Sequence, residues 1–219
     1  MTTVMQEIGP LFTRDAGHKV ILAFGTSNQV AKRVNDGEAI DIVVITSEAI
    51  EQLTRDGRIV DGSRVAVARS FVGVAVRAGA RHPDIGTPEA LKRTLLAVKS
   101  VTFSDPATGA ASGVHAANVF ERLGIAAEMK PKAKLWDGFV GPLVARGEAE
   151  LAIQRISALK AVPGIEIVGP LPPDLQYTTH LSAAVAANSK ASEAAEKFIQ
   201  FLVTPQAAAV IRSKGLDPG

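Results

Sequence analysis

Apolar residues recur along this chain at two spacings, and segments with the two spacings alternate. Residues 2–15 carry apolar side chains at helical intervals, whereas the short runs at 20–24 and 40–45 are continuous, as in buried strands. Helical patterns follow these two runs at 28–36 and 47–57. The order of helix, strand, helix, strand and helix predicts an α/β protein whose crossover helices join parallel strands.

The alternation continues to the end of the chain, with one irregular stretch at 64–80. This apolar run is too long for one ordinary strand, so we predict two short strands that are broken near Arg69 and Ser70. Later strands are predicted at 100–105, 150–157 and 180–188, and two helices in tandem end the chain. No flexible linker or repeat is visible, so a second domain would require two crossings, near 70–78 and 178–184.

Composition narrows the class of protein. The chain has 219 residues, of which 47% are hydrophobic and 21% charged, as in a globular protein with a sizeable core. The net charge of +2 gives no indication of a nucleic-acid partner. The absence of cysteine excludes disulfides, thiolate catalysis and Cys-ligated metals. No stretch could span a membrane, and the first residues do not read as a secretory signal.

Small polar residues follow four of the predicted strands. They occupy residues 25–28, 46–47, 104–113 and 154–157. In a parallel sheet such loops meet at the carboxyl ends of the strands, where ligands bind. Helix N-termini, hydroxyls and glycines together favour an anion. The alternative is that each stretch only caps the helix after it, which is the commoner role of Ser, Thr and Asn at these positions.

Other chemistry has few candidates. The four histidines are scattered without metal-ligand spacing, so no metal site is predicted, and no nucleotide-binding or G-x-S-x-G motif occurs. His115, in the first turn of a predicted helix, is the one candidate for proton transfer. Arg69 and Arg155 lie at strand ends, and a guanidinium group suits a carboxylate ligand.

Five segments together resemble the type II periplasmic solute-binding proteins, in particular the molybdate-binding branch of ABC importers. They include "GHKVILAFGTSNQVAKRVNDGEAIDIVVIT", "SVTFSDPATGAASGVHAANVFERLGI" and "LVARGEAELAIQRIS". The resemblance implies two lobes, each a mostly parallel sheet flanked by helices, with a ligand between them. Lobe 1 would comprise residues 1–75 and 180–219, and lobe 2 residues 76–179. It also implies a periplasmic protein that works with ABC transporter membrane subunits, and we expect a monomer.

The resemblance also implies site residues. Thr26 and Ser27 would supply hydroxyls, and backbone N–H groups near Ser112 and Val140 would complete an oxyanion site. Two departures stand out. Arg155 replaces a strand-end tyrosine found in some molybdate binders, which favours a carboxylate ligand. The family also opens with a strand and a ligand loop that are absent before the first helix here, unless the start of the chain is assigned too late.

We therefore expect a solute-binding protein that captures a small anion, either a molybdate-like oxyanion or an organic carboxylate, without cofactor or catalysis. The alternative is an aconitate-isomerase-like enzyme acting on a small polycarboxylate, with His115, Arg69 and Arg155 as catalytic candidates. The ligand-sensing domain of a regulator is disfavoured because no helix-turn-helix segment occurs. A periplasmic location is expected, or a cytoplasmic one if Met1 is the true start. The candidate ligand-binding residues are Thr26, Ser27, Asn28, Thr46, Ser70, Thr108, Ser112, Gly113, Val140, Gln154 and Arg155.

Overall fold

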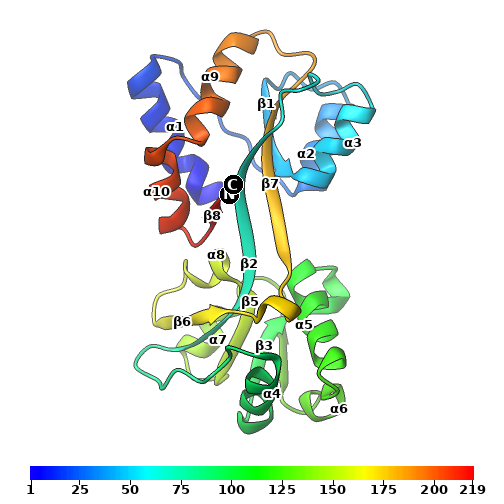
Figure 1. The fold of residues 1–219 in the computed structure, drawn as a ribbon, viewed down its shortest axis with the longest axis vertical. Helices are drawn as coiled ribbons and strands as arrows, with labels where there is room; N and C mark the ends of the chain where they lie inside the picture. The colour runs from blue at the N-terminus through cyan, green and yellow to red at the C-terminus, as the bar shows by residue number, and fades with distance from the viewer. The chain divides into compact units, whose positions relative to one another are not determined.

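The computed structural model describes residues 1–219, which divide into two compact units. Unit 1 comprises residues 1–69 and 179–219, and unit 2 comprises residues 70–178. The first boundary lies between Arg69 and Ser70, rather than after residue 75. Each unit has its own buried core, and the strands of both units are connected through one shared strand (Figure 1).

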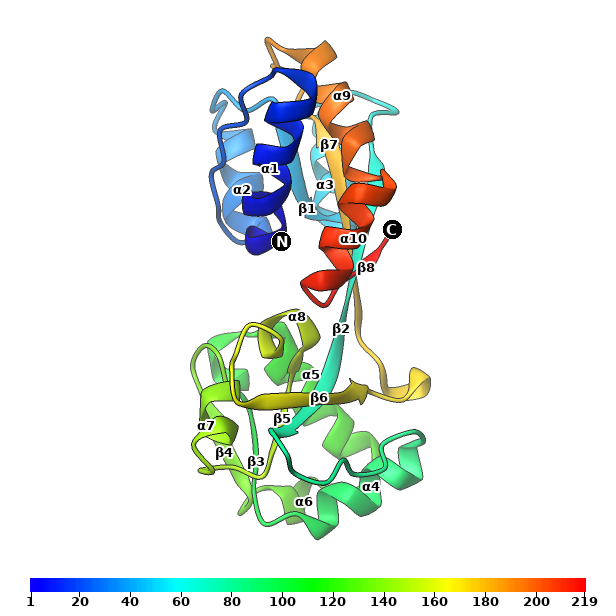
Figure 2. The same ribbon diagram turned by 90° about the vertical axis from the view of Figure 1, so that its left-hand side faces the viewer.

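Unit 1 is a sheet with helices on both faces (Figures 1 and 2). Its strands are β1 (Ile42–Thr46), β7 (Thr178–Val185), the first part of β2 (Val65–Arg77), and β8 (Asp217–Pro218). One face packs against α1 (Thr2–Ala16), α9 (Ser192–Leu202) and α10 (Pro205–Ser213). The other face packs against α2 (Ser27–Asn35) and α3 (Ser47–Arg55).

Unit 2 is built in the same way around a second sheet. Its strands are the second part of β2, β3 (Val101–Ser104), β4 (Ala133–Trp136), β5 (Leu151–Arg155) and β6 (Ile165–Pro170). One face packs against α4 (Pro88–Ala97), α5 (Ala111–Arg122), α6 (Ala126–Met129) and the short helix η2 (Pro173–Leu175). The other packs against α7 (Gly141–Ala145) and α8 (Ile156–Leu159), and η1 (Pro106–Thr108) precedes α5.

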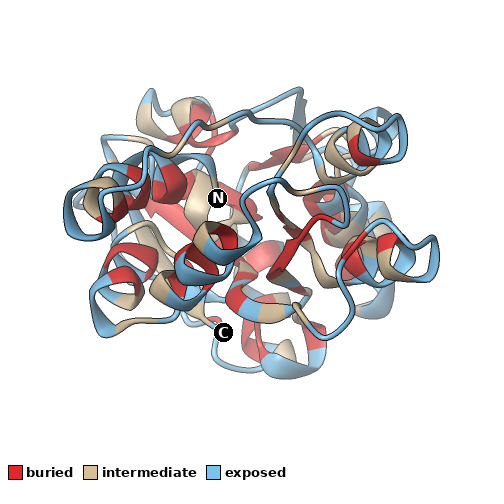
Figure 3. Cartoon of the chain, turned by 90° about the horizontal axis from the view of Figure 1, so that it is seen from above, coloured by how far each residue is buried: buried red, intermediate tan, exposed pale blue.

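The burial pattern explains why these segments form these elements. The helices carry buried residues on the sides that face the strands and exposed residues on their outer sides (Figure 3). In α1 the buried positions Val4, Met5, Ile8 and Phe12 recur at helical spacing. None of the helices is both long and apolar enough to cross a membrane.

The prediction of mostly parallel sheets is wrong. Only β3 with β4 and β3 with β5 run parallel, whereas β1 with β7, and β2 with β5, β6 and β8, are antiparallel. Thr46 pairs with Leu181 and Ile42 with Val185, because β7 enters unit 1 at the end where β1 leaves it. The architecture is therefore a mixed α/β fold.

The predicted break near Arg69 and Ser70 is also wrong, because β2 is one continuous strand of 13 residues. It pairs with β8 at Ala68 and Arg69 and with β5 from Val72 onward. Each half of the strand thus belongs to a different unit. The strand exceeds the ordinary length because it serves two sheets.

The predicted buried strand at 20–24 does not form. Residues 17–26 have no regular secondary structure, and although Val20 and Leu22 pack against the core of unit 1, Ile21 is 84% exposed and Phe24 45% exposed. A strand needs a neighbour for its backbone hydrogen bonds, and no strand pairs with this segment. Apolar composition alone is therefore not enough to make it part of the sheet.

We expect Ile21→Ala to change the free energy of unfolding by no more than about 0.5 kcal/mol, as for other exposed positions. The matched substitution Ile45→Ala, at a residue that is 3% exposed in β1, should cost about 2–5 kcal/mol. Urea unfolding of both variants measures the difference. Equal losses would mean that residues 20–24 are buried in solution.

Candidate functional site

Three parallel strands of unit 2 end side by side, and their following loops form the candidate site. The strands β3, β4 and β5 end at Ser104, Trp136 and Arg155. The backbone N–H of Asp105 donates to the carbonyl of Trp136 at 3.0 Å, which joins the first two loops. Ligands bind at this end of parallel strands in open α/β sheets.

The side chain of Gln154 fastens these loops together. Its amide nitrogen donates to Ser104 Oγ at 2.9 Å and to the Gly138 carbonyl at 2.8 Å, and its Oε1 accepts from the Val140 N–H at 3.3 Å. Gln154 is only 6% exposed. Since these bonds occupy both ends of the amide, Gln154 positions the loops, and the Val140 N–H already has a partner within the chain. Ser104, the first residue of the polar stretch 104–113, belongs to this group.

Gly113 allows the start of α5 to lie directly on the end of β3. A Cβ atom at this position would stand 2.1 Å from the Ser104 carbonyl oxygen. No side chain fits at that distance, so glycine is required here by the close approach of the backbone. The contact fixes the N-terminus of α5 beside the candidate site.

The N-terminus of α5 has no side-chain cap. Its N-cap residue is Ala110, which offers no oxygen to the first-turn N–H groups, and the hydroxyl of Thr108 donates instead to the Asp105 carbonyl at 2.7 Å. Ser112, in the first turn, is buried. Asp105 caps the short helix η1, since its side chain accepts from the Ala107 N–H at 2.9 Å, but no side chain of this loop caps α5. The uncapped end of α5 favours an anion.

Arg155 lies at the end of β5 on the face that α5 covers. It alternates with Gln154 and shares its face with Ile153, which packs in the same core as the α5 residue Ala116. The side chain is half-buried, and its guanidinium has no ion pair or hydrogen bond within the chain. A half-buried cation without a partner is costly, so an anionic ligand would stabilise this arrangement.

Ser70 lies on the same face of the sheet. It precedes Val72 by two residues on β2, and Val72 is paired with Arg155 across the strands. Ser70 is 3% exposed, and its hydroxyl is one of two buried side-chain groups without a hydrogen-bond partner, the other being that of Thr179. Buried polar groups are nearly always paired, so this hydroxyl is a second unsatisfied group near Arg155.

His115 is held on the flank of α5. Its Nε2 lies 2.8 Å from the Leu175 carbonyl oxygen, and its ring centroid is 5.4 Å from that of Tyr177. Tyr177 is 39% exposed. No local signal in the sequence could have placed Tyr177 beside a residue so distant along the chain.

The polar loops of unit 1 form a separate group. Thr26 caps α2, because its side chain accepts a hydrogen bond from the Gln29 N–H at 3.3 Å. The Thr26 N–H in turn donates to the side-chain oxygen of Gln29 at 2.8 Å. Ser27 Oγ accepts from the Thr46 N–H at 3.2 Å, which joins the starts of α2 and α3. Asn28 is exposed in the first turn of α2. Thr26 and Ser27 therefore have structural partners.

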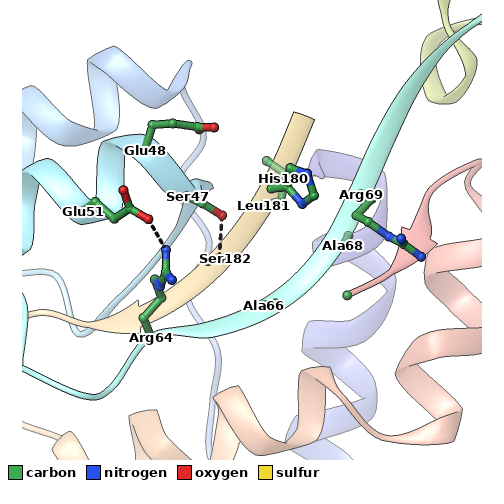
Figure 4. A pocket seen from close by; sticks show the side chains of 11 residues that line it. Ser47, Glu48, Glu51, Arg64, Ala66, Ala68, Arg69, His180, Leu181 and Ser182 are labelled. Atoms are coloured by element: carbon green, nitrogen blue, oxygen red, sulfur yellow. Dashed lines mark hydrogen bonds and ion pairs between the residues drawn. The ribbon is translucent and has the colours of Figure 1, made fainter. Parts of the chain in front are cut away.

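A cavity of about 490 Å³ opens on the sheet of unit 1, between α3, β7 and β2 (Figure 4). Ser47 and Ser182 share a hydrogen bond of 2.8 Å at its wall, and Arg64 pairs with Glu51 at 2.5 Å. Arg69 also lines this cavity, exposed and 4.0 Å from Asp217. Both arginines of this cavity thus have an acidic partner, Arg64 in Glu51 and Arg69 in Asp217, so it offers no unpaired guanidinium comparable to Arg155.

No cluster of three or more His, Cys, Asp or Glu side chains is placed to hold a metal ion. In unit 2 a hydrogen bond joins Val140 to Gln154, and Gly113 lies against Ser104, while Arg155 lies on the opposite face of the sheet from Gln154. In unit 1 a hydrogen bond joins Ser27 to Thr46. Arg69 belongs to unit 1, whereas Arg155 belongs to unit 2.

Comparison with known proteins places the whole chain in one class. A family model described as bacterial extracellular solute-binding protein matches residues 1–217. An aconitate isomerase from Pseudomonas sp is 36% identical over 98% of this chain and 83% of that protein. The molybdate-binding protein ModA of Azotobacter vinelandii is 28% identical over 98% of this chain and 85% of its own length.

Solved structures agree on the fold. A protein described as the substrate binding domain of a molybdenum ABC transporter from Clostridium difficile gives a TM-score of 0.85 at 17% identity, covering 98% of this chain and 93% of that one. The periplasmic molybdate-binding protein of Azotobacter vinelandii gives 0.69 at 19% identity, covering 97% and 93%. The fold is that of type II periplasmic binding proteins.

Gly113→Ala should destabilise the protein by about 1–3 kcal/mol, because the new methyl group must push α5 away from Ser104. The control is Gly86→Ala, where the nearest atom to an added Cβ is Asp84 Oδ1 at 3.5 Å. Thermal or urea unfolding compares the two variants. If both unfold alike, α5 does not lie against β3 as described.

Gln154→Met should lower the free energy of unfolding by about 1–3 kcal/mol. The Val140 N–H, the Gly138 carbonyl and the Ser104 hydroxyl each lose their hydrogen bond to the Gln154 amide. The exposed Gln206→Met on α10 serves as the control and should leave the free energy of unfolding within about 0.5 kcal/mol of the unsubstituted protein. An unchanged stability of Gln154→Met would show that the three loops are held by other contacts.

Proposed function

Because the chain belongs to the bacterial extracellular solute-binding protein family, we propose that it binds a small polycarboxylate and isomerises it by moving a carbon–carbon double bond. The observation that carries this proposal is the half-buried, unpartnered guanidinium of Arg155, which lies on the face of the sheet that α5, with its uncapped start, covers. The relative that is 36% identical and named aconitate isomerase supports the choice of substrate class.

Arg155 fits a carboxylate better than a tetrahedral oxyanion. Its planar fork can donate two parallel hydrogen bonds to one carboxylate, with energy and geometry that a neutral donor does not match. The first-turn N–H groups of α5 offer a second place for negative charge on the same face. A ligand with more than one carboxylate can use both.

The proposed reaction needs positive charge to stabilise an anionic intermediate and one base to transfer a proton. Aconitate is a tricarboxylate with a C=C bond next to a CH₂ group. Loss of a proton from that CH₂ gives an allylic anion, whose negative charge is shared by the two end carbons of the three-carbon unit and by the carboxylates attached to them. Arg155 would stabilise that charge, and return of a proton to the other end of the three-carbon unit gives the isomer. No redox partner or cofactor is needed.

The second candidate function is capture of an anion without catalysis, in the service of ABC transporter membrane subunits. The 28% identity to a molybdate-binding protein favours it, as do the neutral donors at the starts of α2 and α3. A molybdate-like oxyanion would use these hydroxyls and N–H groups, whereas a carboxylate would depend on Arg155. The dependence on Arg155 therefore separates the two.

Arg155→Gln should weaken binding of cis- or trans-aconitate roughly 10-fold to 100-fold, which corresponds to about 1.5–3 kcal/mol for hydrogen bonds to a charged group. Calorimetric titration measures the affinity, and product analysis after incubation measures isomerisation. The control is Arg146→Gln, since Arg146 is exposed and paired with Glu148 at 2.5 Å. Arg155→Lys should recover only part of the affinity because it lacks the fork.

Molybdate and tungstate form the second arm of this experiment. Stabilisation by these oxyanions but not by tricarboxylates, unchanged in Arg155→Gln, would reject the proposed function in favour of the carrier. A ligand selective for the folded state raises the unfolding temperature, so a thermal-shift series reads both arms.

A further inference from the structure

We infer that His115 is the proton-transfer residue of this site and that Nδ1 is the atom that takes and returns the proton. The inference rests on the proposed isomerase function and deepens it by naming the base. It stands on three features of unit 2: the bond that holds the imidazole, the free nitrogen of that ring, and the face of the sheet on which the ring lies.

The bond to Leu175 fixes the tautomer. A backbone carbonyl can only accept a hydrogen bond, so Nε2, at 2.8 Å from the Leu175 oxygen, must carry the ring proton. In the neutral ring Nδ1 then has the free lone pair, and it has no hydrogen-bond partner within the chain. The nitrogen that can accept a proton is thus defined by the fold.

The imidazole is also held in place. Its ring lies against Tyr177, with 33° between the ring planes. Gln176, between Leu175 and Tyr177, donates to the Val72 carbonyl at 3.0 Å and accepts from the Val72 N–H at 2.9 Å, which ties this segment to β2. A base whose orientation is set by packing and hydrogen bonds is preorganised for proton transfer.

His115 lies on the same side of the sheet as the other unsatisfied groups. It belongs to the first turns of α5, which covers the face that carries Arg155 and Ser70. The segment that holds it is anchored to Val72, and Val72 is paired with Arg155. A carboxylate bound by Arg155 and the start of α5 would lie on the face of the sheet that is covered by α5, the helix that carries His115.

The step balances without another reactant. The C–H bond of the CH₂ group breaks, its proton passes to Nδ1, and its electron pair enters the allylic system and the adjoining carboxylate. The proton on Nδ1 then forms a C–H bond at the far carbon of the same unit, and the double bond moves by one position. In ²H₂O, a proton that exchanges from Nδ1 during the step is replaced by deuterium in the product.

The test follows isomerisation and deuterium uptake together by NMR, with cis- or trans-aconitate in ²H₂O. His115→Gln is the informative variant, because the glutamine amide can still donate to the Leu175 carbonyl but offers no basic nitrogen. We expect a loss of about 10²-fold to 10⁴-fold in both rates, with substrate affinity retained. His82→Gln, at an exposed residue that pairs with Glu166, is the control and should behave as the unsubstituted protein.

Tyr177→Phe is the third variant, because it keeps an aromatic ring against His115 but removes the tyrosine hydroxyl. We expect it to remain active. If His115→Gln keeps its isomerisation and deuterium exchange, the assignment is overturned while the isomerase function stays intact. Loss of isomerisation in Tyr177→Phe alone would then point to the tyrosine hydroxyl instead. Absence of any isomerisation by the unsubstituted protein would instead reject the proposed function and the assignment with it.

Discussion

The pairing of β2 with β5 decides where each polar side chain of the candidate site lies. Gly73 is opposite Gln154 and Val72 is opposite Arg155, so these consecutive residues of β5 face opposite sides of the sheet. A shift of one residue would exchange them and place a guanidinium where the buried amide now bonds three loops. At Gly73 a Cβ would stand 2.6 Å from a carbon of the Ile156 side chain, directly after β5, so only glycine fits at this point of the pairing.

The two faces differ in how far the chain satisfies its own polar groups. Both the nitrogen and the oxygen of the Gln154 amide are hydrogen-bonded, to Ser104 and Gly138 and to Val140 respectively. These bonds hold the loops after β3, β4 and β5 together. On the other face Arg155 has no partner, and the buried hydroxyl of Ser70 has none either. The free-energy cost of unpaired polar groups is therefore confined to the face that carries Arg155 and Ser70. A ligand that pairs with these groups can offset that cost.

Small polar residues before a helix have two different uses in this chain. At α2 the Thr26 hydroxyl and the Gln29 side chain cap the helix reciprocally, so the first-turn donors are already partly satisfied. At α5 the N-cap is alanine, and the first turn is instead fixed by the contact of Gly113 with Ser104. The same kind of sequence therefore marks a structural cap in unit 1 and an open helix end in unit 2.

The sequence by itself determined the α/β class, most of the helices and strands, and the strand end and helix start that carry Arg155 and His115, because these follow from local periodicity and from small polar residues at strand ends. It could not decide that residues 20–24 remain outside the sheet, since a strand forms only with a neighbour. Nor could it show that β2 is continuous, or that Arg155 is unpaired while Arg69 faces Asp217. The contact of His115 with Leu175 joins residues 60 positions apart, and only tertiary packing brings such residues together.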